Sequence, residues 1–128
     1  MAIAIIQLGT PRVSMDRLRI GAVRRPPRGV PRSEFAKRDF YDVWLPILSP
    51  SASLVAKGRA AKGKQAWKAF ARLFEKEMSK SDAAGVLDLL AAFSYRIDIE
   101  IGCYCEDEAL CHRSILRRLL MARKAIVV

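Results

Sequence analysis

The apolar positions of this chain form four short runs that predict β-strands. Residues 2–8 are an apolar run, and residues 97–103 carry β-branched isoleucines. Residues 18–23 alternate weakly between apolar and polar positions, and residues 40–45 are rich in aromatic side chains until Pro46 ends the run. The pattern predicts two strands near the N-terminus, one in the middle and one late in the chain.

Longer stretches with apolar residues at helical spacing predict three helices, at residues 65–79, 82–95 and 111–123. Ser79 or Ser81 is the expected N-cap of the second helix. The apolar stripes of the first two consist of Trp67, Phe70, Phe74 and Met78, and of Val86, Leu89, Leu90 and Phe93. A basic stripe on the far side of the first helix is interpreted as an ordinary solvated face, and it consists of Lys64, Lys68, Arg72, Lys76 and Lys80.

Shorter segments connect these elements. Residues 33–38 predict a short helix, and a second short helix is expected around Leu54, capped by Ser51 or Ser53. Residues 58–63 contain small and basic side chains and are interpreted as a linker.

Strands come first along the chain, followed by mixed helices and strands. That order predicts an α/β protein with a small, largely parallel central sheet and helices packed on its faces. With 128 residues, of which 52% are hydrophobic, the chain is expected to form one compact domain over residues 1–128.

The charge is strongly positive and uneven. The formal net charge is +10, and residues 1–64 carry 13 basic against 4 acidic side chains, while residues 65–128 carry 10 against 9. A basic half indicates an anionic partner, either a phosphate-bearing small molecule or nucleic acid. The alternative is that the charge only keeps the protein in solution. No aromatic-rich nucleic-acid motif accompanies the charge.

The three cysteines lie within nine positions, which argues against a secreted disulfide scaffold and favours a reducing cytoplasm. No apolar run is long enough to span a bilayer, and the N-terminal residues do not read as a signal peptide, so no membrane partner is expected. The oligomeric state cannot be read from the sequence.

The segment at residues 102–114 holds all three cysteines and the only histidine. It follows a predicted strand and leads into a predicted helix, which is where α/β proteins place ligands and chemistry. Cys105, Glu106, Cys111 and His112 are therefore the candidate catalytic residues.

Cys111 is the sharpest candidate, because it lies at or near the first turn of the last predicted helix. The helix N-terminus and Arg113 would both stabilise its thiolate, and His112 could serve as acid or base. We expect Cys111 to alkylate faster than Cys103, and Arg113→Ala to slow that reaction while leaving the fold intact. The alternative is that the cysteines only pack in the core.

A structural zinc site of Cys103, Cys105, Cys111 and His112 is a further alternative. The ligand types suit zinc, but the spacing does not match the usual zinc motifs. No metal and no cofactor is therefore the expectation.

A second candidate site lies at residues 24–32, where three prolines stiffen a loop that carries four arginines. Such a loop could clamp a phosphate at the sheet edge that also holds the cysteine segment. The candidate ligand-binding residues there and nearby are Arg24, Arg25, Arg28, Asp42, Trp44 and Arg113.

Three segments together resemble a bacterial family of domains of unknown function, number 488. The segments are residues 19–30, residues 41–51, and the Cys-x-Cys-Glu of residues 103–106 followed by Cys-His-Arg at residues 111–113. The resemblance covers nearly the whole chain and implies a compact α/β domain with a central sheet. It implies site residues at Cys111, His112, Arg113, Arg24 and Arg25, and it supplies no established reaction.

The leading expectation is an enzyme-like α/β domain that binds an anionic, phosphate-bearing or nucleotide-like ligand at the Cys-His-Arg loop. The main alternative is a non-catalytic nucleic-acid-binding module that uses the basic N-terminal half. The two differ in salt dependence, because binding through many phosphate contacts weakens steeply as salt rises.

Overall fold

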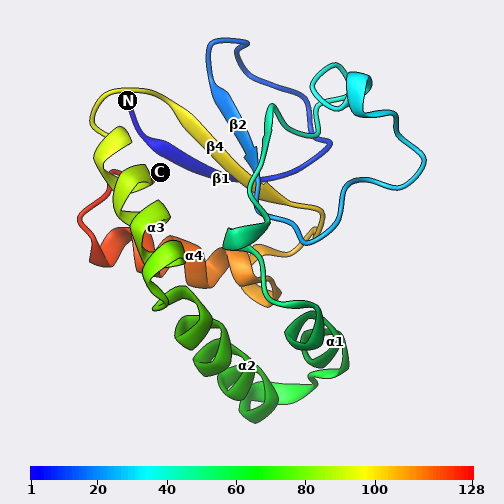
Figure 1. The fold of residues 1–128 in the computed structure, drawn as a ribbon, viewed down its shortest axis with the longest axis vertical. Coiled ribbons are helices and arrows are strands. Elements are labelled where there is room, and N and C mark those ends of the chain that lie inside the picture. The colour runs from blue at the N-terminus through cyan, green and yellow to red at the C-terminus, as the bar shows by residue number, and fades with distance from the viewer.

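A computed structural model describes residues 1–128 and contains one parallel sheet with four helices (Figure 1). The strands are β1 (Ile3–Gln7), β2 (Leu18–Gly21), β3 (Val43–Trp44) and β4 (Ile99–Cys103). All are parallel, in the order β1-β4-β2-β3. The predicted α/β class and parallel sheet are confirmed, and each predicted strand contains an observed one. All carboxyl ends consequently lie at one edge of the sheet.

The predicted strand at residues 40–45 is shorter than expected, since only Val43 and Trp44 form strand. They pair with β2 alone, through Ile20 and Gly21. β3 is an edge strand beside a strand of four residues, so little partner backbone is available to extend it.

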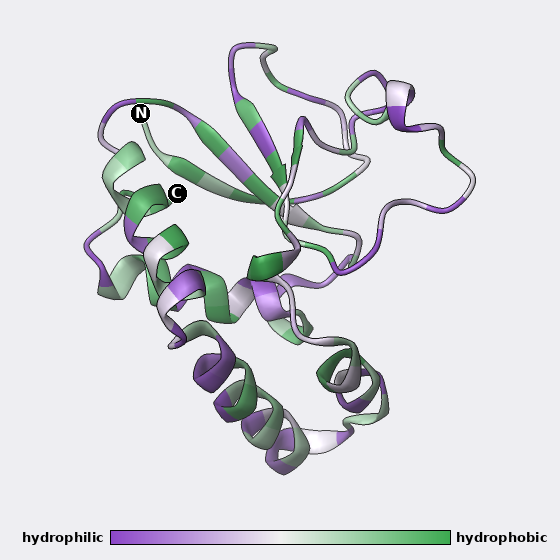
Figure 2. Ribbon diagram, in the orientation of Figure 1, coloured by the Kyte–Doolittle hydropathy of each residue, from purple (hydrophilic) through white to green (hydrophobic).

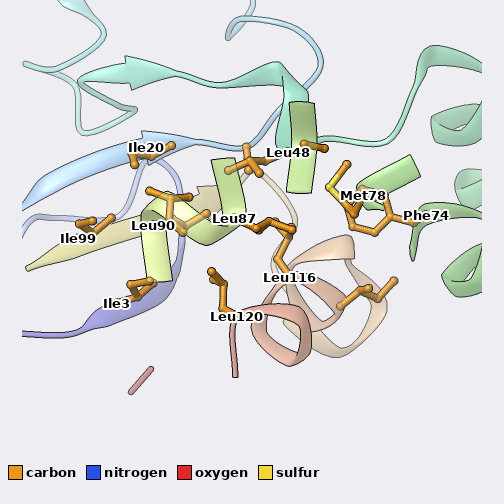
Figure 3. Close-up of a cluster of buried hydrophobic side chains, with 14 of the residues drawn as sticks. Ile3, Ile20, Leu48, Phe74, Met78, Leu87, Leu90, Ile99, Leu116 and Leu120 are labelled. Atoms are coloured by element: carbon orange, nitrogen blue, oxygen red, sulfur yellow. The ribbon is translucent and has the colours of Figure 1, made fainter. Parts of the chain in front are cut away.

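Two helices cover one face of the sheet: α3 (Ser81–Phe93) and α4 (His112–Ala122). Their buried leucines interdigitate with the isoleucines of β1, β2 and β4 in one continuous core, as Figure 3 shows. The members drawn from these elements include Ile3, Ile20, Ile99, Ile101, Leu87, Leu90, Leu116 and Leu120. Burying branched side chains at this density makes the core the main source of stability.

The predicted apolar stripe of α3 is partly wrong. Leu89 and Phe93 are 53% and 38% exposed, while Ala83 and Leu87 are buried together with Leu90. Helix α3 packs in the core through Ala83, Leu87 and Leu90. The face that carries Leu89 and Phe93 is therefore turned towards solvent. Its N-cap is Lys80 rather than Ser79 or Ser81, because the Ser79 hydroxyl already donates to the Lys76 carbonyl.

The helices α1 (Ala52–Ala60) and α2 (Gly63–Met78) form a hairpin that reaches away from the sheet (Figure 1). The predicted cap Ser51 is confirmed, since its hydroxyl accepts from the Leu54 amide. The predicted linker at residues 58–63 is wrong over its first half. Gly58 belongs to α1 because the absence of a side chain lets α1 approach the Phe70 ring, where a Cβ would lie 2.8 Å from the ring.

The expected short helix at residues 33–38 is a single 3₁₀ turn at Arg32–Glu34. No helix of the fold is long and apolar enough to cross a bilayer. Figure 2 shows hydrophobic positions concentrated on the strands and on α3, whereas α2 alternates between hydrophobic and hydrophilic sides.

The side of the sheet opposite the helices holds a buried ion pair. Arg19 of β2 and Glu100 of β4 are paired in the sheet register, and Arg19 Nε lies 2.9 Å from Glu100 Oε1. Arg19 also donates to the carbonyls of Thr10 and Asp39, each at 2.7 Å. Loop backbone rather than a helix therefore meets this ion pair.

Candidate functional site

The cysteine segment lies at the carboxyl edge of the sheet, as expected for a loop between β4 and α4. Cys103 ends β4, and a 3₁₀ turn at Glu108–Leu110 separates it from α4. Asp107 caps that turn by accepting the amide of Ala109, and Cys111 is the N-cap of α4. The Cys111 side chain makes no capping hydrogen bond, and its carbonyl instead accepts the amide of Ser114 in the first turn.

Three sulfur atoms and two basic side chains meet in this segment. The Sγ atoms of Cys103 and Cys105 are 3.9 Å apart. Arg113 Nε donates to Cys111 Sγ at 3.4 Å, and His112 Nδ1 lies 3.6 Å from the same sulfur. Cys111 therefore stands at the centre of the group.

The electrostatics single out Cys111 as the sulfur that carries a negative charge. Hydrogen bonds with the Cys103 and Cys105 thiols lower the pKa of Cys111 far below its usual range. Burial opposes this effect, and His112 adds to it. The pKa of Cys103 is raised, first through its hydrogen bonds with Cys105 and Cys111.

For Cys105 the causes compete. Its hydrogen bond with Cys103 lowers the pKa, but contact with Cys111 and burial outweigh that effect, so the net shift is upward. Within the cluster the pKa of Cys111 is lowered while those of Cys103 and Cys105 are raised, so Cys111 is the sulfur that most readily loses its proton.

His112 is buried and oriented by a second hydrogen bond. Its Nε2 lies 2.7 Å from the carbonyl of Ala22, at the end of β2. A carbonyl only accepts, so Nε2 carries a proton and Nδ1 is left facing Cys111. The Phe74 ring meets the imidazole edge to face, which further limits its rotation.

The Arg113 guanidinium is fully occupied by protein atoms. Besides Cys111, it donates to the carbonyl of Ile6 at 2.6 Å and to that of Cys105 at 2.5 Å. Arg113 is only 2% exposed. It fixes the cysteine loop against β1 and supports the thiolate, and it is not presented to a ligand.

Access to the cluster runs through Cys105. Cys105 and the adjacent Glu106 are exposed, whereas Cys103 and Cys111 are 7% and 3% exposed. A molecule arriving from solvent meets the Cys105 sulfur first. The sequence pattern indicated Cys111 as the nucleophile. The fold buries Cys111 and exposes Cys105 instead.

The fold also brings soft metal-ligand types together. The sulfur atoms of Cys103 and Cys111 and a ring nitrogen of His112 lie within 4.8 Å of one another. The spacing of these residues in the sequence does not match the usual zinc motifs. The fold brings them together because the end of β4 meets the N-terminus of α4. The Arg113 guanidinium on Cys111 places a positive charge where a cation would bind, and this favours a thiolate over a metal.

The arginine loop lies beside the cysteine loop. The Tyr104 hydroxyl donates to the carbonyl of Arg25 at 3.0 Å. Arg24 lies at the base of the arginine loop, where it donates to the carbonyls of Pro46, Ser49 and Pro50, each at 3.0 Å. Arg24 therefore closes the loop onto the segment before α1 and is not free for a ligand.

Arg25, Arg28 and Arg32 are different, because all three are exposed and none forms an ion pair with an acidic side chain. Their charges are available to an anion from solvent. Of the predicted binding arginines, the fold thus leaves Arg25 and Arg28 open and adds Arg32.

A cavity of about 470 Å³ lies at the carboxyl edge of β3. It is lined by Pro26, Arg32, Ser33, Phe35, Ala36, Tyr41, Asp42 and Trp44. Trp44 is half exposed and is held by its indole N–H, which donates to the Val23 carbonyl at 2.7 Å. The lining combines aromatic rings with one cation, which suits a planar, anionic ligand.

Asp42 in that cavity is already neutralised. Arg12 donates two hydrogen bonds of 2.9 Å to its carboxylate oxygens. Burial raises the pKa of Asp42, but the Arg12 pair and the Arg19 amide outweigh it and lower the pKa overall. Asp42 therefore shapes the cavity and does not repel an anion with a free charge.

Tyr41 is a residue that the sequence pattern did not single out. It is 3% exposed, its hydroxyl has no hydrogen-bond partner, and burial raises its pKa. It packs in one apolar cluster with Cys103 and Cys111 and also lines the cavity. Its place inside the predicted strand at residues 40–45 gave no sign that it would line a cavity. That contact depends on Gly21 of β2, where a Cβ would lie 2.4 Å from the Tyr41 ring.

A parallel sheet with a buried cysteine of lowered pKa, an exposed cysteine and unpaired arginines at its carboxyl edge defines an α/β protein with a candidate thiol centre. A family model described as DUF488-N3a, the active DUF488-N3 subclade, matches residues 3–124. The chain belongs to the DUF488 family, as the resemblance implied. No curated protein and no solved structure matches the chain.

Proposed function

We propose that the protein is a thiol-dependent enzyme that acts on a phosphate-bearing, nucleotide-like molecule. The observation that carries the proposal is the sulfur cluster at the carboxyl edge of the sheet, in which Cys105 is exposed and the buried Cys111 contacts Arg113 and His112. The description of the matching family model as an active subclade agrees with a catalytic role. Free thiols also suit the reducing cytoplasm.

In the proposed step, the Cys105 sulfur attacks an electrophilic atom of the ligand and forms a covalent bond. The Cys105 proton moves to the Cys111 sulfur as the new bond forms, so Cys105 attacks without first becoming a free thiolate. The bond from the attacked atom to its leaving group breaks, and that group departs with the electron pair. Cys111 then delivers the proton taken from Cys105 to that group and becomes a thiolate again. Arg113 and His112 hold Cys111 in place throughout.

The ligand is expected in the cavity beside Trp44. An aromatic base would stack on the exposed indole, and its phosphate would meet Arg32 and the free Arg25 and Arg28. The cavity and the thiols share Tyr41, which lines the cavity and belongs to the same apolar cluster as Cys103 and Cys111.

Protection from alkylation tests the proposal. The native protein is treated with iodoacetamide, with and without excess adenosine monophosphate, and modified cysteines are located by peptide mass analysis. We expect the nucleotide to slow modification of Cys105 in a saturable way, and Arg25→Ala together with Arg28→Ala to weaken that protection. Arg123→Ala, at the far end of α4, is the matched control and should keep it. Unprotected Cys105 at every nucleotide concentration would contradict the ligand assignment.

A zinc protein is the second candidate, favoured by the close approach of Cys103, Cys111 and His112. Elemental analysis of protein purified without chelator distinguishes the two. Zinc near one equivalent would replace the thiol proposal, since a bound metal would occupy the Cys111 sulfur.

A further inference from the structure

We propose that the α1–α2 hairpin is a binding surface for the backbone of double-stranded nucleic acid. Residues 52–80 carry eight basic side chains and two acidic ones, so the hairpin holds a net charge of +6 out of the whole protein's +10. A comparison of residues 1–64 with residues 65–128 does not reveal this concentration of positive charge, because the hairpin contains residues from both halves. The proposal goes beyond the thiol chemistry and does not depend on it.

All eight basic side chains of the hairpin are exposed, and none forms an ion pair. They are Lys57, Arg59, Lys62, Lys64, Lys68, Arg72, Lys76 and Lys80. The two acidic side chains are engaged elsewhere: Glu75 pairs with Arg118 of α4 at 3.2 Å, and Glu77 accepts the Ser51 hydroxyl at 2.5 Å. The positive charge is therefore uncompensated from within the protein.

The spacing of the cations suits a regular polyanion. Lys64, Lys68, Arg72 and Lys76 recur at every fourth residue of α2, which places a cation about every 6 Å along the helix. Lys57 of α1 joins Lys76 and Lys80 around a shallow cavity of about 220 Å³ between the two helices. Figure 1 shows the hairpin projecting from the sheet, so a long partner can lie along it without meeting the rest of the molecule.

The side chains of the hairpin favour a duplex over a single strand. Proteins that bind single strands stack bases on exposed aromatic rings. Here Phe70 and Phe74 are buried, and Trp67 is stacked on Phe70 with ring centroids 5.0 Å apart. Phosphate contact without base stacking is typical of duplex backbone binding.

A lipid surface fits less well, because an interfacial helix inserts an apolar face into the membrane. The apolar face of α2 is packed against the rest of the protein, and Leu73 is the one large hydrophobic side chain of the hairpin that is more than a third exposed. Apart from Leu73, the hairpin therefore offers a partner no large apolar side chain, and its charged side chains would make the contacts.

The test is fluorescence anisotropy with a labelled duplex DNA of arbitrary sequence, titrated with the full-length protein at low and moderate salt. Two double variants carry the same change in net charge: Lys68→Glu with Arg72→Glu on the hairpin, and Arg25→Glu with Arg28→Glu on the arginine loop. We expect the hairpin variant to lose at least about tenfold in affinity and its salt slope to fall by about 2, as for two lost phosphate contacts. The loop variant should keep the wild-type slope.

Equal losses in both variants would overturn the proposal, because they would show a response to net charge alone. Absence of binding even at low salt would also overturn it. Competition by polyglutamate as strong as by unlabelled duplex would assign the surface to acidic proteins instead. Circular dichroism melting establishes that the variants are folded, which is expected because both hairpin positions are exposed. Alkylation of Cys105 should be unchanged in the hairpin variant, so the result stands apart from the thiol proposal.

Discussion

At the scale of single residues, the site depends on which atoms accept the hydrogen bonds of each arginine. Arg113 and Arg24 stand in the segments that sequence reasoning assigned to ligand binding, yet each donates to protein atoms. A planar guanidinium offers five donors, and the carboxyl edge of a parallel sheet offers carbonyls that no further strand satisfies. Both arginines therefore build the site, and the exposed Arg25 and Arg28 remain for an anion.

Arg113→Ala is consequently expected to destabilise the fold, and not only to change the thiol. The substitution leaves the carbonyls of Ile6 and Cys105 without their donor inside the protein, and it leaves the Cys111 thiolate without its nearest cation. Losses of this kind cost roughly 2–4 kcal/mol of unfolding free energy. Urea unfolding followed by circular dichroism measures the loss.

The matched control for that measurement is Arg25→Ala. Arg25 is exposed, and replacing it should change the unfolding free energy by less than about 0.5 kcal/mol. An Arg113→Ala protein as stable as the control would show that the three donor contacts contribute nothing to the fold.

At the scale of elements, the close approach of the segment before β3 to β2 places Tyr41 both in the lining of the cavity and in the apolar cluster that holds Cys103 and Cys111. Gly21 makes this possible, because it presents no side chain to the Tyr41 ring. Gly21 is the last residue of β2, and the carbonyl of Ala22, directly after it, binds His112. Strand β2 therefore holds both parts of the site in register.

Gly21→Ala tests that arrangement. The new Cβ would lie 2.4 Å from the ring carbon Cδ2 of Tyr41, so the ring must move. Overpacking of this kind costs about 1–3 kcal/mol, and displacement of Tyr41 should also weaken nucleotide protection of Cys105.

Gly85→Ala in α3 provides the comparison, because nothing lies within 4 Å of its added Cβ. It should raise stability by up to about 1 kcal/mol through helix propensity. Thermal unfolding distinguishes the two variants, and equal melting temperatures would refute the steric argument.

The sequence predicted the order and type of the elements because each carries its own local signal. The isoleucine run of β4, the aromatic stripe of α2 and the Ser51 cap depend on neighbouring residues only. The burial of Tyr41 and the buried pair of Arg19 with Glu100 depend on which strands become neighbours. Contacts between β2 and β4 join residues about 80 positions apart, and no local pattern encodes them.

The candidate site was predicted in part for the same reason. Position after a strand was enough to pick out Cys105, Cys111, His112 and Arg113. Which of them reaches solvent depends on the packing of α4 against the sheet. The exposure of Cys105 and the burial of Cys111 therefore emerge only from the fold.

At the scale of the whole molecule, acid stability is linked to two partly exposed ion pairs. Arg117 lowers the pKa of Glu108 through a hydrogen bond of 2.6 Å. Asp42 also has a lowered pKa, because its pairing with Arg12 outweighs the effect of burial. Each carboxylate binds its proton more weakly in the folded than in the unfolded chain. Their stabilisation is therefore fully present above the unfolded pKa, near 4, and is lost as pH falls through the lower folded pKa.

We expect the unfolding free energy to decline as pH falls below about 4.5. The variant Glu108→Gln should be less stable than wild type near neutral pH and approach it at low pH, since protonation removes the same ion pair. Urea unfolding at a series of pH values measures both curves. A constant difference between them at all pH values would contradict the linkage.

The central claim is that Cys105 and Cys111 form one thiol centre with a thiolate already present at neutral pH. The most direct measurement is the rate of Cys105 alkylation by iodoacetamide in native protein between pH 6 and 8. For an ordinary thiol the rate falls roughly 80-fold over that interval as the thiolate disappears. We expect a nearly constant rate for the wild type and an ordinary pH dependence for Cys111→Ser, with Arg123→Ala at the far end of α4 as the control that keeps the flat profile. A wild-type rate that falls like that of a free thiol, or modification only after denaturation, would contradict it.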